Sequence, residues 1–503
     1  MISFFLSLLI LFLGYKTYGT FLDRKFEPDD RKTPAITKND GVDYVPMKTW
    51  RVFLIQLLNI AGLGPIFGAI TGALWGPVVF LWIVFGTIFA GAVHDYLSGM
   101  LSERNGGASI AEIVGKYLGN VARQIMRVFS IILLMMVGVV FMVGPAELIA
   151  MLTPTYFNVR FWTIVILCYY TLSSFLPIDK LVSKIYPVFG ISLLMMAFLI
   201  GGITIFNDVI GVAKMPELWD NFGNMHHHKI PIFPMMFVSV ACGAISGFHA
   251  TQSPMMARCI TSEKYGKKVF YGAMCMESVI ALIWAAASST FFYDAQTGGW
   301  LAEKLINING KDELIKFIGN SSSVYGMSMS LLGIVGGIFA ILGVIVCPIT
   351  SGDASFRSVR FAVADLFKIN QQNILKRLVL TLAILSTGYF ISLFDYSVIW
   401  RYFSWSNQTL AMIVLWAGAV FLCKYKGKNI GWMASIPATF MSAVSMSYLL
   451  QAKEGFGLNA CLSNVIGVCF ALVLLSVYFV KVYLKIKKDN KEITKTRKVL
   501  KKI

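Results

Sequence analysis

The chain has 503 residues, of which 57% are hydrophobic and 14% charged, and its mean hydropathy is +0.69. A soluble protein of this length carries nearer a quarter charged residues, so the composition excludes an ordinary soluble domain and indicates a membrane protein with many spans. The formal net charge is +18, but ten of the 44 Lys and Arg residues fall in 481–503. Such a tail is typical of the cytoplasmic side of a membrane, so no nucleic-acid partner is expected.

Thirteen apolar segments, each about 20 residues long as a helix needs to cross the hydrocarbon core, follow one another along the chain. The first contains Lys16 near its end and no small-residue cleavage site follows, so we expect a retained helix rather than a signal peptide. The predicted spans are 2–22, 50–72, 76–101, 124–152, 161–179, 183–207, 232–257, 268–293, 325–350, 374–393, 397–422, 430–452 and 459–484.

The charges of the connecting loops predict the orientation of these spans. Even without the tail itself, the loops on the side of the C-terminal tail hold 25 Lys and Arg residues, whereas those on the other side hold seven. The positive-inside rule therefore places the C-terminus in the cytoplasm and the N-terminus outside. The two long outside loops are 208–231 and 294–324, and a short surface helix is expected in the second.

Neither loop is large enough for a soluble catalytic or nucleotide-binding domain, and the sequence contains no GxxxxGK[ST] motif. ATP-driven transport by this chain alone is therefore not expected. Nor do we expect an enzyme, because the sequence has no metal-spaced His/Glu pair and no nucleophile elbow.

Two predicted spans contain helix breakers at mid-depth. The first reads NIAGLGPIFGAI at 59–70, and the second contains CGAISGFHA at 242–250. If 50–72 is numbered as the first helix, the second break falls in the sixth, which runs in the opposite direction. Interrupted helices at matching places in two halves are typical of inverted-repeat transporters. Glycine alone would favour close helix packing, but Pro65 and the matching second break favour a site.

The two breaks predict where a substrate binds. Irregular backbone survives in a membrane only where it is buried or lines a cavity, and half-helix N-termini there offer N–H groups to anions. His249 follows the second break and either binds a substrate carboxylate, responds to pH or is a satisfied core histidine. The predicted substrate-binding residues of the breaks are Ala61, Gly62, Leu63, Gly64, Pro65, Gly243, Ser246, Gly247, Phe248 and His249.

Several stretches together resemble the carbon starvation protein A (CstA) family. They are DGVDYVP at 40–46, AGLGPIFG at 61–68, GAVHD at 91–95, CGAISGFHA at 242–250, CPITSGDASFRSVR at 347–360 and WRYFSWSNQTLA at 400–411. The resemblance implies a bacterial inner-membrane importer of peptides or pyruvate that serves when preferred carbon runs short. The family is similar to the amino acid–polyamine–organocation transporters, which implies a LeuT-like fold with two inverted five-helix repeats.

The predicted architecture is therefore all-α and polytopic, with broken helices at 59–68 and 242–250. We expect a secondary transporter of a small carboxylate-bearing substrate, coupled to a proton or a sodium gradient and embedded in the lipid bilayer. A membrane sensor or structural subunit that binds substrate without moving it is the alternative. The predicted parts are an extra N-terminal helix and loop at 1–49, the first repeat at 50–207, an external loop at 208–231, the second repeat at 232–425, two further helices at 426–484 and a basic tail at 485–503.

Ionisable side chains at membrane depth are costly and usually functional. Asp95, beside His94, is expected either to accept a coupling proton or to close an inner gate by pairing with Arg357 or Arg360. Glu147 is a proton relay, an external gate or a buried hydrogen-bonded carboxylate that fixes Gly144–Pro145. Glu277 in 268–293 is a further carboxylate of this kind.

CPITSGD at 347–353 places hydroxyl groups beside a carboxylate in the eighth helix of the repeats. In LeuT-like transporters this helix faces the first break, so Thr350 and Ser351 are a candidate sodium site, since hard cations prefer oxygen ligands. The alternative is a helix cap, with Asp353 and Arg357 as an ordinary i,i+4 pair. Apart from sodium, no cofactor is predicted.

RYFSWSNQ at 401–408 mixes aromatic and amide side chains. Trp405 and Asn407 are expected either to line the substrate cavity or, as interfacial anchors, to sit at the membrane boundary. The triplet HHH at 226–228 lies in an outside loop, where a solvated loop is favoured over a metal site.

Overall fold

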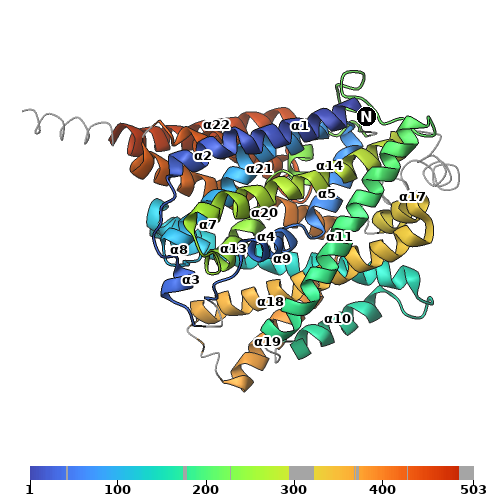
Figure 1. The fold of residues 1–503 in the computed structure, drawn as a ribbon, viewed down its shortest axis with the longest axis horizontal. Helices are drawn as coiled ribbons and strands as arrows, with labels where there is room; N and C mark the ends of the chain where they lie inside the picture. Colours follow the sequence, from blue (N-terminus) through green and yellow to red (C-terminus); the bar gives the residue numbers. More distant parts are fainter. Residues whose placement is uncertain are drawn as a thin grey trace, which may run out of the picture.

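The computed structural model describes the chain except for residues 41–43, 174–177, 227, 294–321, 368, 370–372, 428 and 486–503. It leaves undescribed the side chains of 178–189, 293, 322, 340–342, 346, 347 and 365. Every regular element in the described part is a helix, and long helices such as α1, α14, α18 and α22 run along the longest axis of the molecule (Figure 1). The predicted tail at 485–503 and the predicted surface helix in 294–324 fall almost entirely outside the described residues.

The helices of the first half are α1 Ile2–Lys16, α2 Tyr18–Phe26, α3 Pro34–Thr37, α4 Thr49–Ile60, α5 Gly64–Gly72, η1 Ala73–Trp75, α6 Val79–Leu81, η2 Trp82–Gly91, α7 Ala92–Arg104, α8 Ile110–Leu118, α9 Asn120–Leu152, α10 Val159–Ser173 and α11 Ile178–Val209. Those of the second half are η3 Ile232–Met236, α12 Phe237–Ser239, α13 Gly247–Ala257, η4 Glu263–Tyr265, η5 Lys267–Tyr271, α14 Gly272–Tyr293, α17 Ser322–Ala340, η6 Ile341–Val346, α18 Cys347–Leu366, α19 Ile374–Ile391, α20 Tyr396–Phe421, η7 Leu422–Lys426, α21 Trp432–Gln451, α22 Ala460–Tyr478 and η8 Phe479–Leu484.

The described residues confirm an all-helical polytopic protein but not the number of thirteen spans. Nine helical segments are long and apolar enough to cross a membrane, or eleven if each of two bent pairs is counted as one span. The two predicted spans left out are 161–179, where α10 has 15 residues, and 232–257, which is divided among η3, α12 and α13.

The predicted span 325–350 is not one continuous helix. It is a bent pair, with the segments 323–339 and 343–364 at an angle of 71°, and α18 extends to Leu366. Two features explain the bend. Gly333 has a positive φ of 59° inside α17, and the wider helical turns of η6 separate α17 from α18.

The loops predicted to face the cytoplasm meet at one end of the molecule. Arg104 donates from Nε and Nη2 to the Glu263 carboxylate, at 2.5 and 3.0 Å, and from Nη2 to the backbone oxygen of Glu27. Lys426 donates to the Glu27 carboxylate at 2.9 Å. Four loops that share the predicted side are thus in contact, as the loop charges require.

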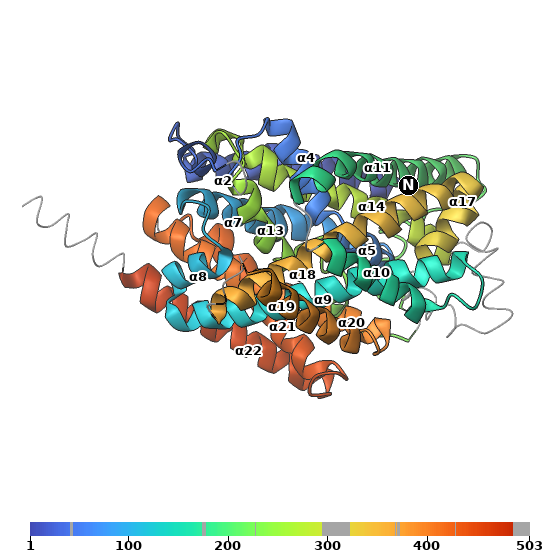
Figure 2. The ribbon, with the colours of Figure 1, turned by 90° about the horizontal axis from the view of Figure 1, so that it is seen from below.

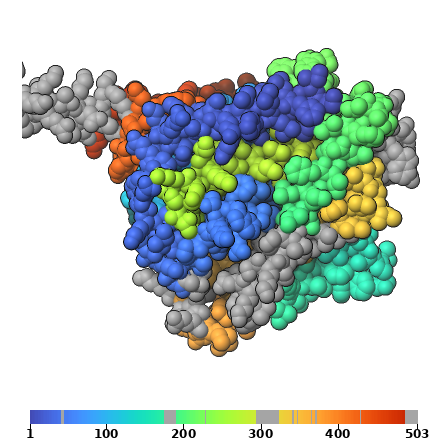
Figure 3. Space-filling model, in the orientation of Figure 1, coloured from blue at the N-terminus to red at the C-terminus, as the bar shows by residue number. Residues whose placement is uncertain are grey.

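The start of the chain contacts the predicted outside loop 208–231. The backbone N–H groups of Ile2 and Ser3 both donate to the Glu217 carboxylate at 2.8 Å, and the N-terminal ammonium also binds it. In the space-filling view the N-terminal segment crosses one face of the molecule beside the segment that contains α14 (Figure 3). Each end of α1–α2 therefore contacts loops that were predicted to lie on its own side of the membrane. Which of the two sides faces the cytoplasm stays a prediction.

The first predicted break is confirmed, because α4 ends at Ile60, α5 begins at Gly64 and the two helices are bent by 49°. Pro65 stands in the first turn of α5, where its missing N–H is not needed, so the proline begins the second half-helix. The second gap lies at 240–246 rather than 242–250, since α13 already begins at Gly247. Phe248 and His249 therefore belong to the first turn of α13 and not to the irregular segment.

These elements enclose the two breaks within the helix bundle. α13 packs against α4, α7 and α20, and α14 packs against α5 and α1. α9 lies between α20 and α18. In the view from below, α13 and α5 lie inside the bundle, while α22 and α11 lie on opposite edges (Figure 2).

Candidate functional site

The two breaks are in direct contact. A Cβ added at Gly64 would lie 2.3 Å from Sγ of Cys242, and one added at Gly68 would lie 3.2 Å from the backbone oxygen of Ser239. A Cβ on Gly243 would approach Cα of Pro65 to 3.9 Å. Close packing therefore explains the glycine at 64, and the same packing brings the two irregular segments together.

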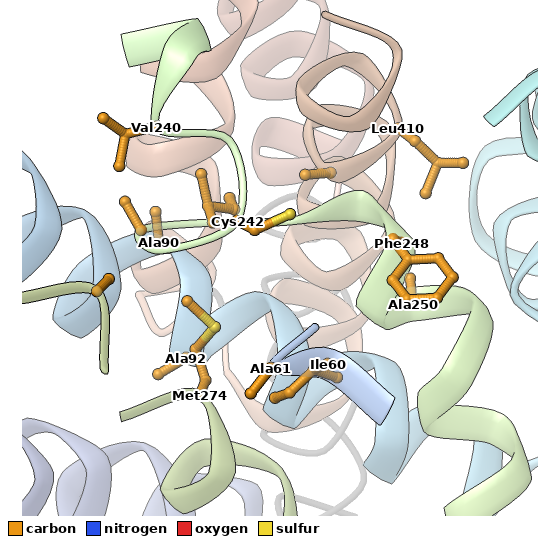
Figure 4. Packing of buried hydrophobic residues seen from close by; sticks show 14 of the residues in the cluster. Ile60, Ala61, Ala90, Ala92, Val240, Cys242, Phe248, Ala250, Met274 and Leu410 are labelled. Carbon is orange, nitrogen blue, oxygen red and sulfur yellow. The ribbon is translucent and has the colours of Figure 1, made fainter. Parts of the chain in front are cut away.

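The two broken helices run antiparallel, as an inverted repeat requires. Gln56 of α4 donates from Nε2 to Oγ of Ser253 on α13 at 3.3 Å. Further along, Gly64 meets Cys242 and Gly72 meets Val240, so residue numbers rise along one helix as they fall along the other. Figure 4 shows the end of α4 at Ile60 and Ala61 and the irregular segment that carries Cys242.

Asn407 of α20 holds the start of α13. Its Oδ1 accepts from the Phe248 backbone N–H at 2.7 Å and from Oγ of Ser246 at 3.1 Å, and its Nδ2 donates to Sγ of Cys242 at 3.3 Å. An added Cβ at Gly247 would lie 2.4 Å from the backbone oxygen of Asn407, so α20 also touches the helix start directly. An amide oxygen thus occupies the position at which a helix N-terminus binds an anion.

A chain of buried titratable groups begins beside the second break. His94 and Asp95 lie in the first turn of α7, and His249 lies in the first turn of α13. The two carboxylate oxygens of Asp95 lie 2.8 Å from Nδ1 of His94 and 2.8 Å from Nδ1 of His249, and all three side chains are fully buried. With Asp95 ionised, both imidazoles donate to it through Nδ1.

This row of buried titratable side chains continues to Glu277 on α14. Nε2 of His249 lies 3.3 Å from Oε2 of Glu277, whose side chain is also fully buried. Within the described residues, neither Nε2 of His249 nor either carboxylate oxygen of Glu277 has a hydrogen-bond partner, so this contact is at ion-pair distance only. If His249 donates from Nδ1 to Asp95, a proton joins the contact when the ring is charged or when Glu277 is protonated.

Neighbouring side chains tie this group to the backbone of the second break. Oγ1 of Thr87 lies 2.6 Å from Oγ of Ser278, the residue after Glu277, and 3.4 Å from the Gly243 carbonyl oxygen. An added Cβ at Gly91 would lie 2.1 Å from the Ala244 carbonyl oxygen. A movement of the segment 240–246 must therefore disturb the contacts of η2 and α14.

Other predicted site residues lie elsewhere. Trp405 faces α21, where its Nε1 donates to the Ser445 carbonyl oxygen at 3.1 Å. It points away from Asn407 because two residues that are two positions apart lie on different faces of a helix. Glu147 is half-buried on α9, in the same region as the buried Tyr396.

The predicted pairing of Asp95 with Arg357 or Arg360 is wrong in this structure. Arg357 donates from Nε and Nη2 to Oδ2 of Asp353, at 3.0 and 2.8 Å, and Oδ1 of Asp353 accepts from Oγ of Ser173 at 2.5 Å. The i,i+4 spacing on α18 makes this pair local, and Asp95 is satisfied by histidines instead.

Thr350 and Ser351 lie on α18, which packs mainly against α9 and not against the first break. The Ser351 carbonyl oxygen accepts from Oγ of Ser355 at 2.9 Å, while Oγ of Ser351 is buried and has no hydrogen-bond partner among the described residues. The sodium site at Thr350 and Ser351 stays a prediction.

Of the predicted triplet, His227 lies outside the described residues. His226 is buried against Trp75 at 4.8 Å between ring centroids, and its Nδ1 accepts from the His228 backbone N–H at 3.2 Å. Within the described part of the chain, no three or more His, Cys, Asp or Glu side chains are arranged as metal ligands.

Sequence reasoning did not assign Glu277 to the site or join it to His249. The available signal was a carboxylate within the apolar stretch of α14, which is costly unless it is used. Thr87 and Ser278 carried no signal, since hydroxyls are common in membrane helices and only the fold brings these two together.

Comparison with known proteins places these features in a family. The family described as carbon starvation protein CstA matches residues 1–153, 146–296 and 318–448. An uncharacterised membrane protein of Haemophilus influenzae is 40% identical, over 59% of this chain and 92% of that protein. The peptide transporter CstA of Campylobacter jejuni is 26% identical over 97% of this chain and 86% of its own length, and the pyruvate/proton symporter BtsT of Escherichia coli is 24% identical over 86% and 79%.

Solved structures agree on the fold. A manganese transporter of Eremococcus coleocola superposes with a TM-score of 0.52 at 12% identity, covering 90% of this chain and 99% of that one. MhsT in complex with L-phenylalanine gives a TM-score of 0.51 at 14% identity, covering 84% and 97%. At these identities the likeness concerns the LeuT-like fold alone. With its two antiparallel broken helices and a family match over most of its length, this chain belongs to the CstA family of membrane transport proteins.

Proposed function

We propose that this chain is a proton-coupled importer of a small carboxylate-bearing carbon source, a short peptide or pyruvate, in a bacterial inner membrane. We further propose that it serves when preferred carbon is scarce and that the N-terminus lies outside. The names of the relatives support the substrate class, since they include peptide transporters and a pyruvate/proton symporter.

The observation that carries the proposal is the buried chain His94–Asp95–His249–Glu277. Four titratable groups in a dry interior are expensive to maintain, and they occur in membrane proteins where protons are moved. These four side chains come from α7, α13 and α14. The thiols of Cys242 and Cys275 are titratable groups that lie beside them.

Proton loading and the conformation of the second break are linked through His249. A charged His249 is balanced by carboxylates on both sides, from Asp95 and Glu277. When the ring is neutral, an ionised Glu277 has no donor there, and neither of the two carboxylates has the positive charge of His249 beside it. Because His249 stands in the first turn of α13, moving that helix relative to α14 changes which protonation state is stable.

We place the substrate carboxylate at the start of α13. Oδ1 of Asn407 now accepts from the Phe248 N–H, and a carboxylate that replaced it would receive the same donor and the favourable end of the helix dipole. Alternating access would then follow when the bundle that contains the two broken helices rocks against the remaining helices.

The test uses purified protein in liposomes with labelled dipeptide and pyruvate. An inward pH gradient without sodium should drive accumulation above the equilibrium level, and collapse of the gradient by a protonophore should abolish it. Accumulation that follows a sodium gradient and ignores the pH gradient would instead favour sodium coupling through Thr350 and Ser351. Binding without uptake or counterflow would identify a sensor and refute transport.

A further inference from the structure

A second cleft lies away from the two breaks, between α10, α18 and α19. Its polar lining consists of Tyr170, Asp353, Arg357, Arg360 and Thr381, and its remaining walls are apolar. Its empty volume, with the open mouth included, is about 250 Å³. Neither the substrate position nor the buried titratable chain uses these residues.

The charges of this cleft do not balance. Arg357 is paired with Asp353, so these two contribute no net charge. Arg360 is 5% exposed, and its contacts are a 3.3 Å hydrogen bond from Nη1 to Oγ1 of Thr381 and the ring of Phe361 at 5.0 Å. Its Nε has no hydrogen-bond partner within the described part of the chain. Because the nearby carboxylate of Asp353 is already held by Arg357, an anionic ligand would offset the desolvation of the Arg360 charge.

A second donor lines the same space. The hydroxyl of Tyr170 is buried and has no hydrogen-bond partner among the described residues. Buried polar groups are nearly always satisfied, and two such donors on one cleft indicate an acceptor that both share. An oxyanion fits, because it accepts from a guanidinium and a phenol at once.

The surroundings of the cleft favour a lipid as the source of the oxyanion. The outer face of α19 is apolar and exposed, with Leu375 at 69% and Val379 at 60%, so acyl chains can lie along it. Arg377 is one helical turn before Thr381 and adds a cation on the same face. The loop 357–377 is predicted to be cytoplasmic, and the cytoplasmic leaflet carries the anionic lipids.

We propose that this cleft binds the phosphate of an anionic phospholipid, which accepts from Nε of Arg360 and the hydroxyl of Tyr170 while an acyl chain follows α19. The site is separate from substrate binding, and its occupancy does not depend on the transported compound.

The test measures lipid binding to the purified full-length protein by native mass spectrometry and by thermal shift, with phosphatidylglycerol and phosphatidylcholine as probes. Arg360→Gln should weaken phosphatidylglycerol binding about tenfold to a hundredfold, as expected for the loss of a charged hydrogen bond. Phosphatidylcholine has the same phosphate, but its choline cation cancels the negative charge, so it should bind more weakly to the wild type and respond less to the substitution. Tyr170→Phe, which removes a hydroxyl without a partner, should weaken it by about two- to tenfold. Arg127→Gln, on the predicted cytoplasmic part of α9, is the matched control and should leave binding unchanged.

Equal phosphatidylglycerol binding by the wild type, Arg360→Gln and Tyr170→Phe would overturn the proposal. If Arg360→Gln fails to fold, Tyr170→Phe decides alone. Stabilisation by inorganic phosphate or pyruvate that depends on Arg360, without a response to phosphatidylglycerol, would assign the cleft to a soluble anion and refute the lipid.

Discussion

Asp95→Asn is the sharpest perturbation of the proposed proton pathway. Asp95 is fully buried and accepts from Nδ1 of His94 and Nδ1 of His249, each at 2.8 Å. Asparagine keeps the shape of the side chain but replaces one acceptor oxygen by an NH2 group. One of the two hydrogen bonds can therefore survive, and the negative charge is lost in either orientation.

The expected magnitude follows from this geometry. A hydrogen bond to a charged group contributes about 1.5–3 kcal/mol, so the variant should lose about that much stability rather than twice as much. The charged form of His249 also loses one of its two neighbouring carboxylates, and this destabilises the charged form by a similar free energy. The fraction of carriers that load a proton should therefore fall by about tenfold to a hundredfold.

The assay compares two activities of the same liposomes. Accumulation driven by an inward pH gradient should fall at least tenfold in Asp95→Asn, while counterflow of labelled against unlabelled substrate at equal pH should persist. Asp353→Asn is the matched control, because it also removes a buried carboxylate with a strong partner, Arg357. Asp353→Asn should lower the stability of the protein and leave the ratio of pH-driven accumulation to counterflow unchanged.

Two results would refute the reasoning. Wild-type accumulation by folded Asp95→Asn would show that the proton travels elsewhere. Equal uncoupling by Asp353→Asn, with counterflow intact, would place the coupling site on α18 instead of α7 and α13.

Three further changes test the neighbouring features. Asn407→Asp should weaken substrate affinity more than Asn407→Ala, because its carboxylate would occupy the Phe248 N–H that we assign to the substrate; equal Km values in uptake would contradict this. Gly64→Ala places a Cβ 2.3 Å from Sγ of Cys242 and should cost about 1–3 kcal/mol in thermal unfolding, with partial recovery when Cys242→Gly is added. Burial opposes ionisation of Glu217, but the N-terminal ammonium, the Ser3 hydroxyl and backbone N–H groups together lower its pKa to about 2. Because folding lowers this pKa, ionised Glu217 stabilises the fold fully above about pH 4.5, and this stabilisation is lost as the pH falls towards 2. After solvent screening the loss is no more than about 1–2 kcal/mol. Glu217→Gln should remove this part of the difference between the unfolding free energies measured at pH 6 and pH 3.

Local sequence patterns were informative where the cause of the structure is itself local. The break at Ala61–Leu63 follows from Gly62, Gly64 and Pro65, since these residues disfavour a continuous helix wherever they stand. The second break was shifted by a few residues, because CGAISGFH alone does not show that Asn407 of another helix begins α13 at Gly247.

The partners of charged residues were not available from such patterns. Of the two roles expected for Asp95, proton acceptor or gate partner of an arginine, the second required an arginine contact, and Asp95 meets two histidines instead. His249 and Glu277 are 154 and 182 positions further along the chain, and no spacing rule links residues so far apart. Trp405 and Asn407 were treated as one wall, although the helical turn sends them to different neighbours.

The sequence by itself determined that this is a polytopic helical membrane protein with two breaks in helices of opposite direction and many more Lys and Arg residues in the loops of one side than in those of the other. These properties depend on composition, hydropathy and local backbone preference, which act within about 20 residues. Only the tertiary structure decided that the breaks touch, that Asn407 occupies the start of α13, and that His94, Asp95, His249 and Glu277 form one buried chain. Their proximity arises from the packing of α7, α13, α14 and α20, which is a property of the whole fold.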